Sequence, residues 1–542
     1  MCQQMPRVLR TRLLHKRFLR KRVLRKNLLP QSLLRQSLMS VLCLSFVAAE
    51  LQAQLLAGFG ERDITPELID VWTDVDGNAQ FDPDIDAWED VNKNGTFDGV
   101  WMAGFQNNRP AQGVEAPLKA VAMVVDDGRY RIGIVAADTI GLMRTFVQDL
   151  RRALPPSLGL DYVLVHATHN HEGPDTQGLW GTGPMRSGVD PDYMVFLRDQ
   201  MMGALADSVS ALEPARLHMA SIPNTPMTPV RDARKPEVID DQIRVLVLES
   251  VDQRILGSIV NFGIHVELAW DRNLKLTSDV AGYLREGLSH GIVYDGALLK
   301  EGIGGTTLWL TGNIGGLMTS GPGEWVDDPF LNERISDGGH AKARAFGYGL
   351  ASAVIDGWQN KQFWSSDQAT LDVMTRDVEL GISNWMLALA TLTGVVDSSP
   401  SLHLTPPFVR YTSEISWIKL GQATLTGIPG ELYPEIAVGG IENPLGADFE
   451  IAPVEVPPLR DALSGRVNLM VNLANDAIGY IIPKSEWDNE APWIYGETEE
   501  TYGEIVSLGE ETAPTLHERL MLLLREVQGR VSEEGSTSLD PR

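Results

Sequence analysis

The stretch Tyr162-Val-Leu-Val-His166-Ala-Thr-His169-Asn-His171-Glu-Gly-Pro174 joins a short apolar run to three histidines and a Gly-Pro break. The apolar run predicts a buried strand. Alternate side chains of an extended backbone share a face, so His169 and His171 are expected to point the same way. Neutral imidazole is the commonest metal ligand in proteins, so this pair indicates a metal site. The alternative is a solvated polar loop that holds three of the ten histidines of the chain.

On both sides of this stretch, apolar runs alternate with amphipathic segments. Strands are expected at Ala57–Pro66, Ala120–Val125, Tyr130–Ala137, Tyr162–His166, Ile243–Leu248, Ile255–Val260 and Thr307–Leu310, with two more in 408–428. Helices are expected at Arg144–Ala153, Pro191–Ala211, Val280–His290, 340–360 and 514–528. This mixture predicts an α/β (mixed α+β) fold, with a central sheet flanked by helices in one large catalytic domain over residues 54–530. Residues 531–542 are expected to form a disordered tail.

The N-terminal region has the layout of a secretory signal. Lys and Arg crowd the first 35 residues, and an apolar run from Ser37 to Ala49 follows. We therefore expect residues 1–53 to be a signal peptide that is cleaved before Gln54, and the protein to be exported to the periplasm or the medium. The run is too short to span a bilayer, so no transmembrane segment is expected in the mature chain. The alternative is a basic arm that binds nucleic acid or a membrane surface.

The composition narrows the possible partners and metal ligands. With 72 Asp and Glu against 46 Lys and Arg, the chain has a formal net charge of −26, which repels nucleic acid and anionic membranes. Both cysteines, Cys2 and Cys43, fall within the predicted leader. The mature chain therefore has no cysteine nucleophile and no thiolate metal site, and any metal must be held by His, carboxylate or phenolate.

Residues 70–105 form an acidic insertion with one pattern repeated twice. Side-chain oxygens at positions 1, 3, 5 and 9 of a loop can wrap around a hard cation, and Gly95 stands where the second loop must turn sharply. Position 12 carries Ile85 in the first loop and Trp101 in the second, where an EF-hand has a glutamate. We expect EF-hand-like loops that bind structural Ca²⁺; the alternative is an acidic surface loop. The expected ligands are Asp74, Asp76, Asn78 and Asp82 in the first loop, and Asp90, Asn92, Asn94 and Asp98 in the second.

Three further residues are candidates for the metal site. His265 follows the expected strand Ile255–Val260, Glu431 comes directly after a tight turn, and Tyr480 follows a glycine. Each also has a simpler explanation: a buried core histidine, a solvated carboxylate and a core aromatic residue.

Taken together, these segments resemble the neutral/alkaline non-lysosomal ceramidase family, from Gly58 to about Tyr502. The segments that carry the resemblance are Gly60-Glu-Arg-Asp-Ile-Thr-Pro66, Ala167-Thr-His-Asn-His-Glu-Gly-Pro174, His265 with Thr277-Ser-Asp279-Val-Ala-Gly-Tyr283, Pro429-Gly-Glu431 and Gly479-Tyr480. The resemblance implies a zinc amidase. Matched by position, its metal ligands are His169, His265, Glu431 and Tyr480. It also implies that His171 lies beside the metal and takes part in catalysis.

General chemistry agrees with this implied site. A few nitrogen and oxygen ligands with one open position lower the pKa of a bound water to about 7 and polarise a carbonyl oxygen. A histidine beside the metal can then take a proton from water and pass it to the leaving amine.

The chain departs from the family where a polar active-site serine is expected. Gly316 stands in place of an Asp and Met318 in place of the Ser, and a thioether cannot act as a nucleophile. Thr319 or Ser320 could substitute after a shift of register. The backbone N–H groups of Gly315 and Gly316 could still face an oxyanion. By rough alignment, Tyr495 is an additional phenol of the site.

These inferences lead to one main hypothesis and two alternatives. We expect an exported zinc-dependent hydrolase that cleaves an amide bond of a small or lipid-like N-acyl substrate, similar to ceramide, with metal-activated water. The first alternative is a zinc hydrolase of an ester, a lactone or another N-acyl compound. The second is a non-catalytic, Ca²⁺-stabilised extracellular binding protein. Only about forty residues follow Tyr502, so the C-terminal Ig-like domain of the family is not expected.

Overall fold

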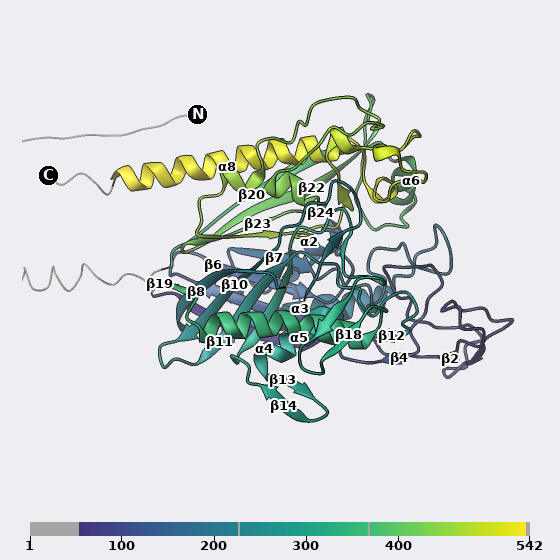
Figure 1. Ribbon diagram of the computed structural model, residues 1–542, viewed down its shortest axis with the longest axis horizontal. Helices are drawn as coiled ribbons and strands as arrows, with labels where there is room; N and C mark the ends of the chain where they lie inside the picture. Colours follow the sequence, from purple (N-terminus) through teal and green to yellow (C-terminus); the bar gives the residue numbers. More distant parts are fainter. Residues whose placement is uncertain (1–53, 226–227, 367–368, 538–542) are drawn as a thin grey trace, which may run out of the picture. The chain divides into compact units, whose positions relative to one another are not determined.

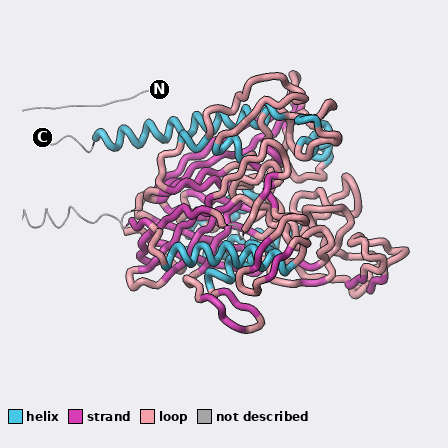
Figure 2. Tube along the Cα trace, in the orientation of Figure 1, coloured by secondary structure: helices cyan, strands magenta, loops and turns pink. Residues whose placement is uncertain are grey.

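A mixed sheet of nine strands forms the centre of the fold (Figures 1 and 2). The computed structural model describes residues 54–225, 228–366 and 369–537. The strands run in the order β15-β11-β10-β8-β1-β5-β6-β7, and β19 pairs with β8. Helices flank this sheet, so the predicted α/β (mixed α+β) fold class is confirmed. The strands are β1 (Leu56–Asp63), β5 (Lys119–Asp126), β6 (Arg131–Ala137), β7 (Tyr162–Ala167), β8 (Glu213–Pro223), β10 (Gln242–Ser250), β11 (Ile255–Phe262), β15 (Thr306–Thr311) and β19 (Trp364–Ser366).

The two faces of this sheet belong to different hydrophobic cores. In β5, Ala122 and Val124 face a core that helices cover, whereas Val121 and Met123 face a second sheet. Because both faces are buried, the strand is an unbroken apolar run rather than an alternation of apolar and polar residues. The helical face is covered by α3 (Pro191–Ser210), α4 (Asp279–Ser289) and α5 (His340–Gln359), and α2 (Arg144–Ala153) packs in the same core as α3.

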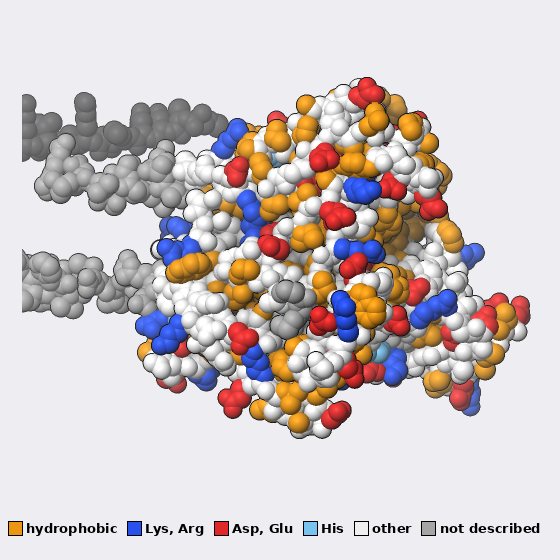
Figure 3. Space-filling model, viewed as in Figure 1, with side chains coloured by type: hydrophobic (Ala, Val, Ile, Leu, Met, Phe, Trp, Pro, Cys, Tyr) orange, Lys and Arg blue, Asp and Glu red, His pale blue; other side chains and the backbone are white. Residues whose placement is uncertain are grey.

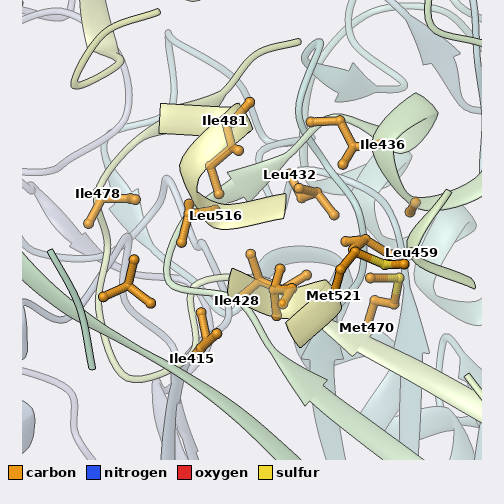
Figure 4. Close-up of a cluster of buried hydrophobic side chains, with 14 of the residues drawn as sticks. Ile415, Ile428, Leu432, Ile436, Leu459, Met470, Ile478, Ile481, Leu516 and Met521 are labelled. Atoms are coloured by element: carbon orange, nitrogen blue, oxygen red, sulfur yellow. The ribbon is translucent and has the colours of Figure 1, made fainter. Parts of the chain in front are cut away.

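A second sheet packs on the other face of the first one. It has the order β20-β22-β23-β25, with β21 beside β22, and its apolar side chains interleave with those of the central sheet. Its outer face carries α8 (Thr512–Thr537) and the short α7 (Pro434–Val438), and Figure 4 shows the side chains that fill this layer. The result is a four-layer arrangement of helix, sheet, sheet and helix. The strands are β20 (Leu371–Ile382), β21 (Ser401–Leu402), β22 (Val409–Leu420), β23 (Ala423–Gly427) and β25 (Val467–Val471).

The C-terminal segment differs from the expectation of a disordered tail at 531–542. Helix α8 continues to Thr537, well beyond the helix expected at 514–528. An ion pair between Arg530 and Glu526, one helical turn apart, supports the last turns. Residues 538–542 lie outside the described residues, as does the predicted signal peptide 1–53. Among the helices of the described residues, none combines the length and the hydrophobicity of a membrane-spanning segment.

Gly58 tests the close packing between β1 and α3. A Cβ atom at this position would lie 2.1 Å from the backbone oxygen of Ser208, which cannot move without distorting the end of α3. We expect Gly58→Ala to lower the free energy of unfolding by about 1–3 kcal/mol, the usual cost of overpacking. Gly113→Ala is the control, because its nearest neighbour would be the Lys275 side chain at 3.9 Å. Equal unfolding midpoints in urea for the two variants would contradict this account of the packing.

Candidate metal centre

The histidine motif begins where β7 ends, at Ala167. The backbone does not stay extended beyond this point, because His169 has φ of 63°, in the left-handed region. The predicted reason for the shared direction of His169 and His171 was therefore wrong: a turn, not strand alternation, sets the two imidazoles. Non-glycine residues rarely adopt this conformation, and where they do it often serves a site.

The segment after β11 brings a third imidazole to the same place. β11 ends at Phe262, and the residues beyond it run beside the histidine motif, with an isolated bridge between Asn170 and Val266. The His171 N–H also donates to the Val266 oxygen at 2.9 Å. This backbone pairing places His265 next to His169, and their ring centroids lie 4.8 Å apart.

Two very short strands supply the carboxylate and the phenol. β24 (Glu431–Leu432) and β26 (Tyr480–Ile481) pair in parallel, and the register sets Glu431 opposite Tyr480. Parallel neighbours in register point their side chains to the same face of the pair. The two residues therefore reach the same side, although 48 residues separate them.

The five side chains meet at one buried point. The Nε2 atoms of His169 and His265 lie 3.5 and 3.3 Å from Oε2 of Glu431. The Tyr480 hydroxyl lies 3.3 Å from His265 Nε2, and His171 Nε2 lies 3.3 Å from His169 Nε2. Donors about 2.1 Å from a tetrahedral zinc ion are about 3.4 Å from one another, so this spacing suits one ion. The three histidines form a group that could hold a metal.

Hydrogen bonds of the Nδ1 atoms orient the imidazoles of His169 and His265 so that their Nε2 atoms face the centre. Nδ1 of His169 lies 2.8 Å from the Ile140 oxygen, and Nδ1 of His265 lies 3.0 Å from the Met318 oxygen. A carbonyl oxygen only accepts, so both Nδ1 atoms carry the proton and each neutral ring turns an Nε2 lone pair toward Glu431. Oε2 of Glu431 is buried and has no hydrogen-bond partner, although the residue is only 6% exposed. A cation at this point would bind the Nε2 atoms of His169 and His265 and Oε2 of Glu431.

The charges at the centre depend on one another. Burial would raise the pKa of Glu431, but positive charge on the imidazoles of His169 and His265 would outweigh burial and hold its pKa below the usual range. A cation bound between the same three groups would supply that charge while both rings stay neutral. Burial would lower the pKa of His265, yet Glu431 and Glu267 raise it. Burial, followed by the Glu431 carboxylate, raises the pKa of Tyr480 well above that of an ordinary phenol. Ionisation of this phenol therefore requires a cation beside it.

His171 has a carboxylate partner that the sequence interpretation missed. Oε2 of Glu267 lies 3.2 Å from His171 Nδ1, and the Thr319 hydroxyl donates to the other oxygen at 2.6 Å. Burial, followed by repulsion from His169 and His265, lowers the pKa of His171 well below its usual value, so this ring is neutral at pH 7. The alternation His265-Val266-Glu267 just after a buried strand could have indicated this partner, since it places His265 and Glu267 at the same strand end.

The centre opens into an apolar cavity of about 930 Å³, its mouth included. All five side chains of the centre line it, and Tyr502 and Tyr411 add two more phenols. Cavities of this kind, with a few polar groups in an apolar wall, are typical of sites for small molecules. The apolar side chains of the wall are Ile140, Met143, Leu179, Trp180, Ile382, Leu387, Val396, Leu473, Ile478, Val506 and Leu508.

The expected oxyanion turn is not available to the centre. The N–H of Gly315 donates to the Leu432 oxygen at 2.9 Å, so it cannot bind an oxyanion. Gly316 and Tyr495 line a different cavity, whose wall contains none of the five side chains, and the Tyr495 hydroxyl donates to Glu442 at 2.7 Å. The structure therefore places these three residues apart from the centre: Gly315 packs tightly against Tyr433, and Gly316 and Tyr495 line the other cavity.

Met318 takes a structural part at the position where the resemblance predicted a serine. Its side chain is buried in a hydrophobic core, and its carbonyl oxygen accepts from both the backbone N–H and Nδ1 of His265. The neighbouring Thr319 bonds to Glu267, whereas the hydroxyl of Ser320 is buried without a partner. Of the alternatives considered from the sequence, Thr319 is thus the hydroxyl connected to the centre.

The acidic insertion folds around its own aromatic core. Phe81 and Phe97, at the same position of each loop, stack with ring centroids 3.9 Å apart, and Trp72, Trp88 and Trp101 pack around them. Within the loops, Asp74 accepts from three backbone N–H groups. The remaining expected calcium ligands line the same two turns: Asp76, Asn78, Asp82, Asp90, Asn92, Asn94 and Asp98.

Neither acidic loop has a glutamate at its twelfth position, but each is bonded by a buried aspartate from outside the twelve positions of the loop. Asp86 accepts from the N–H groups of Val75 and Asp82 in the first loop, and Asp74, Asp76 and Asp86 form a group that could hold a metal. Asp70 accepts from the equivalent N–H groups of Val91 and Asp98 in the second loop. The sequence interpretation missed both, because one lies beyond its loop and the other precedes the loop that it serves.

Comparison with known proteins adds the fold. No protein-family model and no curated protein sequence matches this chain. Among solved structures, the neutral ceramidase from Pseudomonas aeruginosa matches with a TM-score of 0.59 and 16% identity, over 88% of this chain and 75% of that one. A ceramidase complexed with C2 matches with a TM-score of 0.60 and 14% identity, over 88% of this chain and 76% of that one. This protein has the fold of the neutral ceramidases.

Proposed function

We propose that this protein is a zinc-dependent hydrolase that cleaves the amide bond of an N-acyl, ceramide-like substrate. The observation that carries the proposal is the convergence of two Nε2 lone pairs, an unpartnered carboxylate oxygen and a phenol at the wall of an apolar cavity. His169, His265, Glu431 and Tyr480 would hold the ion. The shared fold supports the proposal, since the two solved structures described above are ceramidases.

A zinc ion bound there would supply Lewis acidity for a carbonyl oxygen and would acidify a water molecule. The protein's own groups supply the proton transfers. Neutral His171 accepts a proton from water at Nε2 and passes it to the leaving amine, while Glu267 faces Nδ1 and stabilises the charged ring. Thr319 holds Glu267 in place through its hydroxyl. His171 Nε2 lies 3.3 Å from His169 Nε2, a spacing that also suits a metal ligand, and metal analysis of a His171 variant distinguishes the two roles.

The cavity supports an apolar substrate. Its wall is mostly aliphatic and aromatic, which favours an acyl or other hydrocarbon chain beside the scissile bond. A zinc hydrolase of an ester or lactone is the second candidate, and Met318 favours it: the hydroxyl of the family is absent at this position. Turnover of paired N-acyl and O-acyl substrates with one acyl chain separates the two candidates.

We further propose that the acidic insertion binds Ca²⁺ as a structural ion and that the protein is exported. Asp86 and Asp70 provide the buried carboxylates that the loop pattern lacks. Clustered carboxylates repel one another unless a cation is present, so the ion would stabilise the insertion. Export rests on the basic and apolar layout of residues 1–53.

The first prediction separates a metal ligand from a proton carrier. His169→Ala should lose stoichiometric zinc, whereas His171→Ala should keep the zinc and lose turnover by about 10²–10⁴-fold, the usual worth of a general acid or base. Metal analysis of the purified variants and hydrolysis of a fluorogenic N-acyl substrate, with and without a chelator, measure both. Loss of zinc from His171→Ala would instead make His171 a ligand, and full activity in that variant would remove it from the mechanism.

The second prediction concerns the wall behind His171. A Cβ atom at Gly104 would lie 2.3 Å from the imidazole, and its φ of +96° adds strain for any other residue. Gly104→Ala should therefore displace His171 and reduce kcat by at least about tenfold, as misplacement of a catalytic group does. Gly183→Ala, where a Cβ would have open space, is the control. Equal kcat values for the two variants would rule out this steric role.

The third prediction concerns the calcium loops. Asp86→Asn removes the charge of a residue that is 6% exposed, so it should weaken the increase in thermal midpoint that Ca²⁺ gives. Asp84→Asn is the matched control, because it removes the same charge from an exposed residue two positions earlier. Thermal unfolding with and without Ca²⁺ measures the effect. No Ca²⁺ dependence in the wild-type protein would refute the structural ion.

A further inference from the structure

One wall of the cavity is a helix that is apolar on both of its faces. Helix α6 (Trp385–Thr393) turns Leu387 and Thr391 into the cavity and buries Ala390. Its outward face is also apolar: Trp385 is 72% exposed, Met386 37%, Leu389 44% and Leu392 48%. A helix that is hydrophobic all round is normally buried in protein or in lipid. The outward face of α6 therefore lacks the polar side chains that a solvent-exposed helix normally has.

A neighbouring loop extends the exposed apolar surface. β20 ends at Ile382, which pairs with Val409 at the start of β22, and the loop before Val409 leaves this same end of the second sheet. In that loop Leu404 is fully exposed and Phe408 is 57% exposed. In Figure 3, orange side chains gather over the part of the molecule where Figure 1 labels α6. The apolar rim consists of Trp385, Met386, Leu389, Leu392, Leu404 and Phe408.

The rim is fixed to the catalytic cavity by the start of the helix. The Asn384 side chain accepts from the N–H groups of Met386 and Leu387 and so caps α6. Its amide group donates to the oxygens of Ile505 and Ser507, in the segment whose Val506 side chain lines the cavity. The exposed face and the cavity wall are thus two sides of one short, capped helix.

The charge of the rim selects the kind of partner. Between Asn384 and Phe408 the chain has a single acid, Asp397, and no Lys or Arg, whereas the whole chain carries a net charge of −26. A basic protein partner would be matched by unengaged acids at the contact, whereas Glu379 and Glu510 beside the rim are already bonded to Arg410 and Ser383. An anionic bilayer would be repelled by the rest of the molecule. A lipid surface without net charge is the partner that meets both conditions.

We propose that the apolar rim docks on a lipid surface of zero net charge, such as a zwitterionic bilayer, and places the cavity against it. Leucine and tryptophan side chains of an interfacial helix insert at the boundary between head groups and acyl chains. A lipid substrate could then pass along α6 into the cavity without crossing water. The proposal rests on the proposed function for one point only, namely that the cavity receives the substrate.

Vesicle flotation tests this proposal without any turnover. Wild-type protein should float with phosphatidylcholine vesicles, and Leu389→Glu should weaken this binding by about tenfold or more, since it replaces an inserted apolar group by a charge. Leu298→Glu is the matched control, because Leu298 is 53% exposed in the hairpin of β13 (Ile292–Tyr294) and β14 (Ala297–Lys300), outside the rim. Leu389→Glu should keep the wild-type unfolding midpoint, and its turnover of a short, water-soluble N-acyl substrate should be unchanged.

Several results would overturn the proposal. These are failure of the wild-type protein to float, equal loss of binding in Leu389→Glu and Leu298→Glu, or binding that requires anionic lipid. A concentration-dependent dimer that Leu389→Glu abolishes would assign the rim to self-association instead. Failure of the proposed hydrolase function is a separate result, since it would appear as absent turnover of the soluble substrate whatever the vesicles show.

Discussion

The arrangement of the molecule depends on one buried carboxylate, Glu431, held between two imidazoles. A carboxylate at this depth is costly unless positive charge or hydrogen-bond donors face it, and the lone pairs of His169 and His265 do not supply donors. Backbone carbonyls fix the protons of both rings on the far side, at Ile140 and Met318. The fold therefore builds a point that is satisfied by a cation, and the four-layer core provides the rigidity to hold it.

Rigidity also explains how such distant residues meet. The ends of two central-sheet strands deliver the histidines, and a two-residue parallel pair in register delivers Glu431 and Tyr480. Because both faces of the central sheet are buried, the strand ends cannot shift independently. Met318 also helps to position the centre. Its side chain, which is unsuited to catalysis, is buried, and its carbonyl oxygen orients His265, a proposed ligand.

The acidic insertion reaches the metal centre, although none of its carboxylates does. Its last residues return to the histidine motif, where Ala103 donates to the Gly173 oxygen and Met102 bridges to Pro174. Phe105 then packs edge-on against His171, with ring centroids 5.3 Å apart. Order in the insertion is thereby connected to the position of the His171 imidazole through a few backbone contacts. A structural ion in the loops would act on the centre by this route.

Long apolar runs and amphipathic periods are local signals, and they predicted seven of the nine strands of the central sheet and the helices that flank it, but not β8 or β19. The sequence by itself also pointed to the five residues of the centre, through a resemblance whose residues the fold brings together. How these residues meet depends on long-range contacts: the left-handed turn at His169, the Glu267 partner of His171, and the burial of the turn at Gly315. The second sheet was likewise only partly visible, as β20 and β25 acquire their partners from distant segments. Burial, register and hydrogen-bond direction arise from such long-range packing, which no local stretch of sequence encodes.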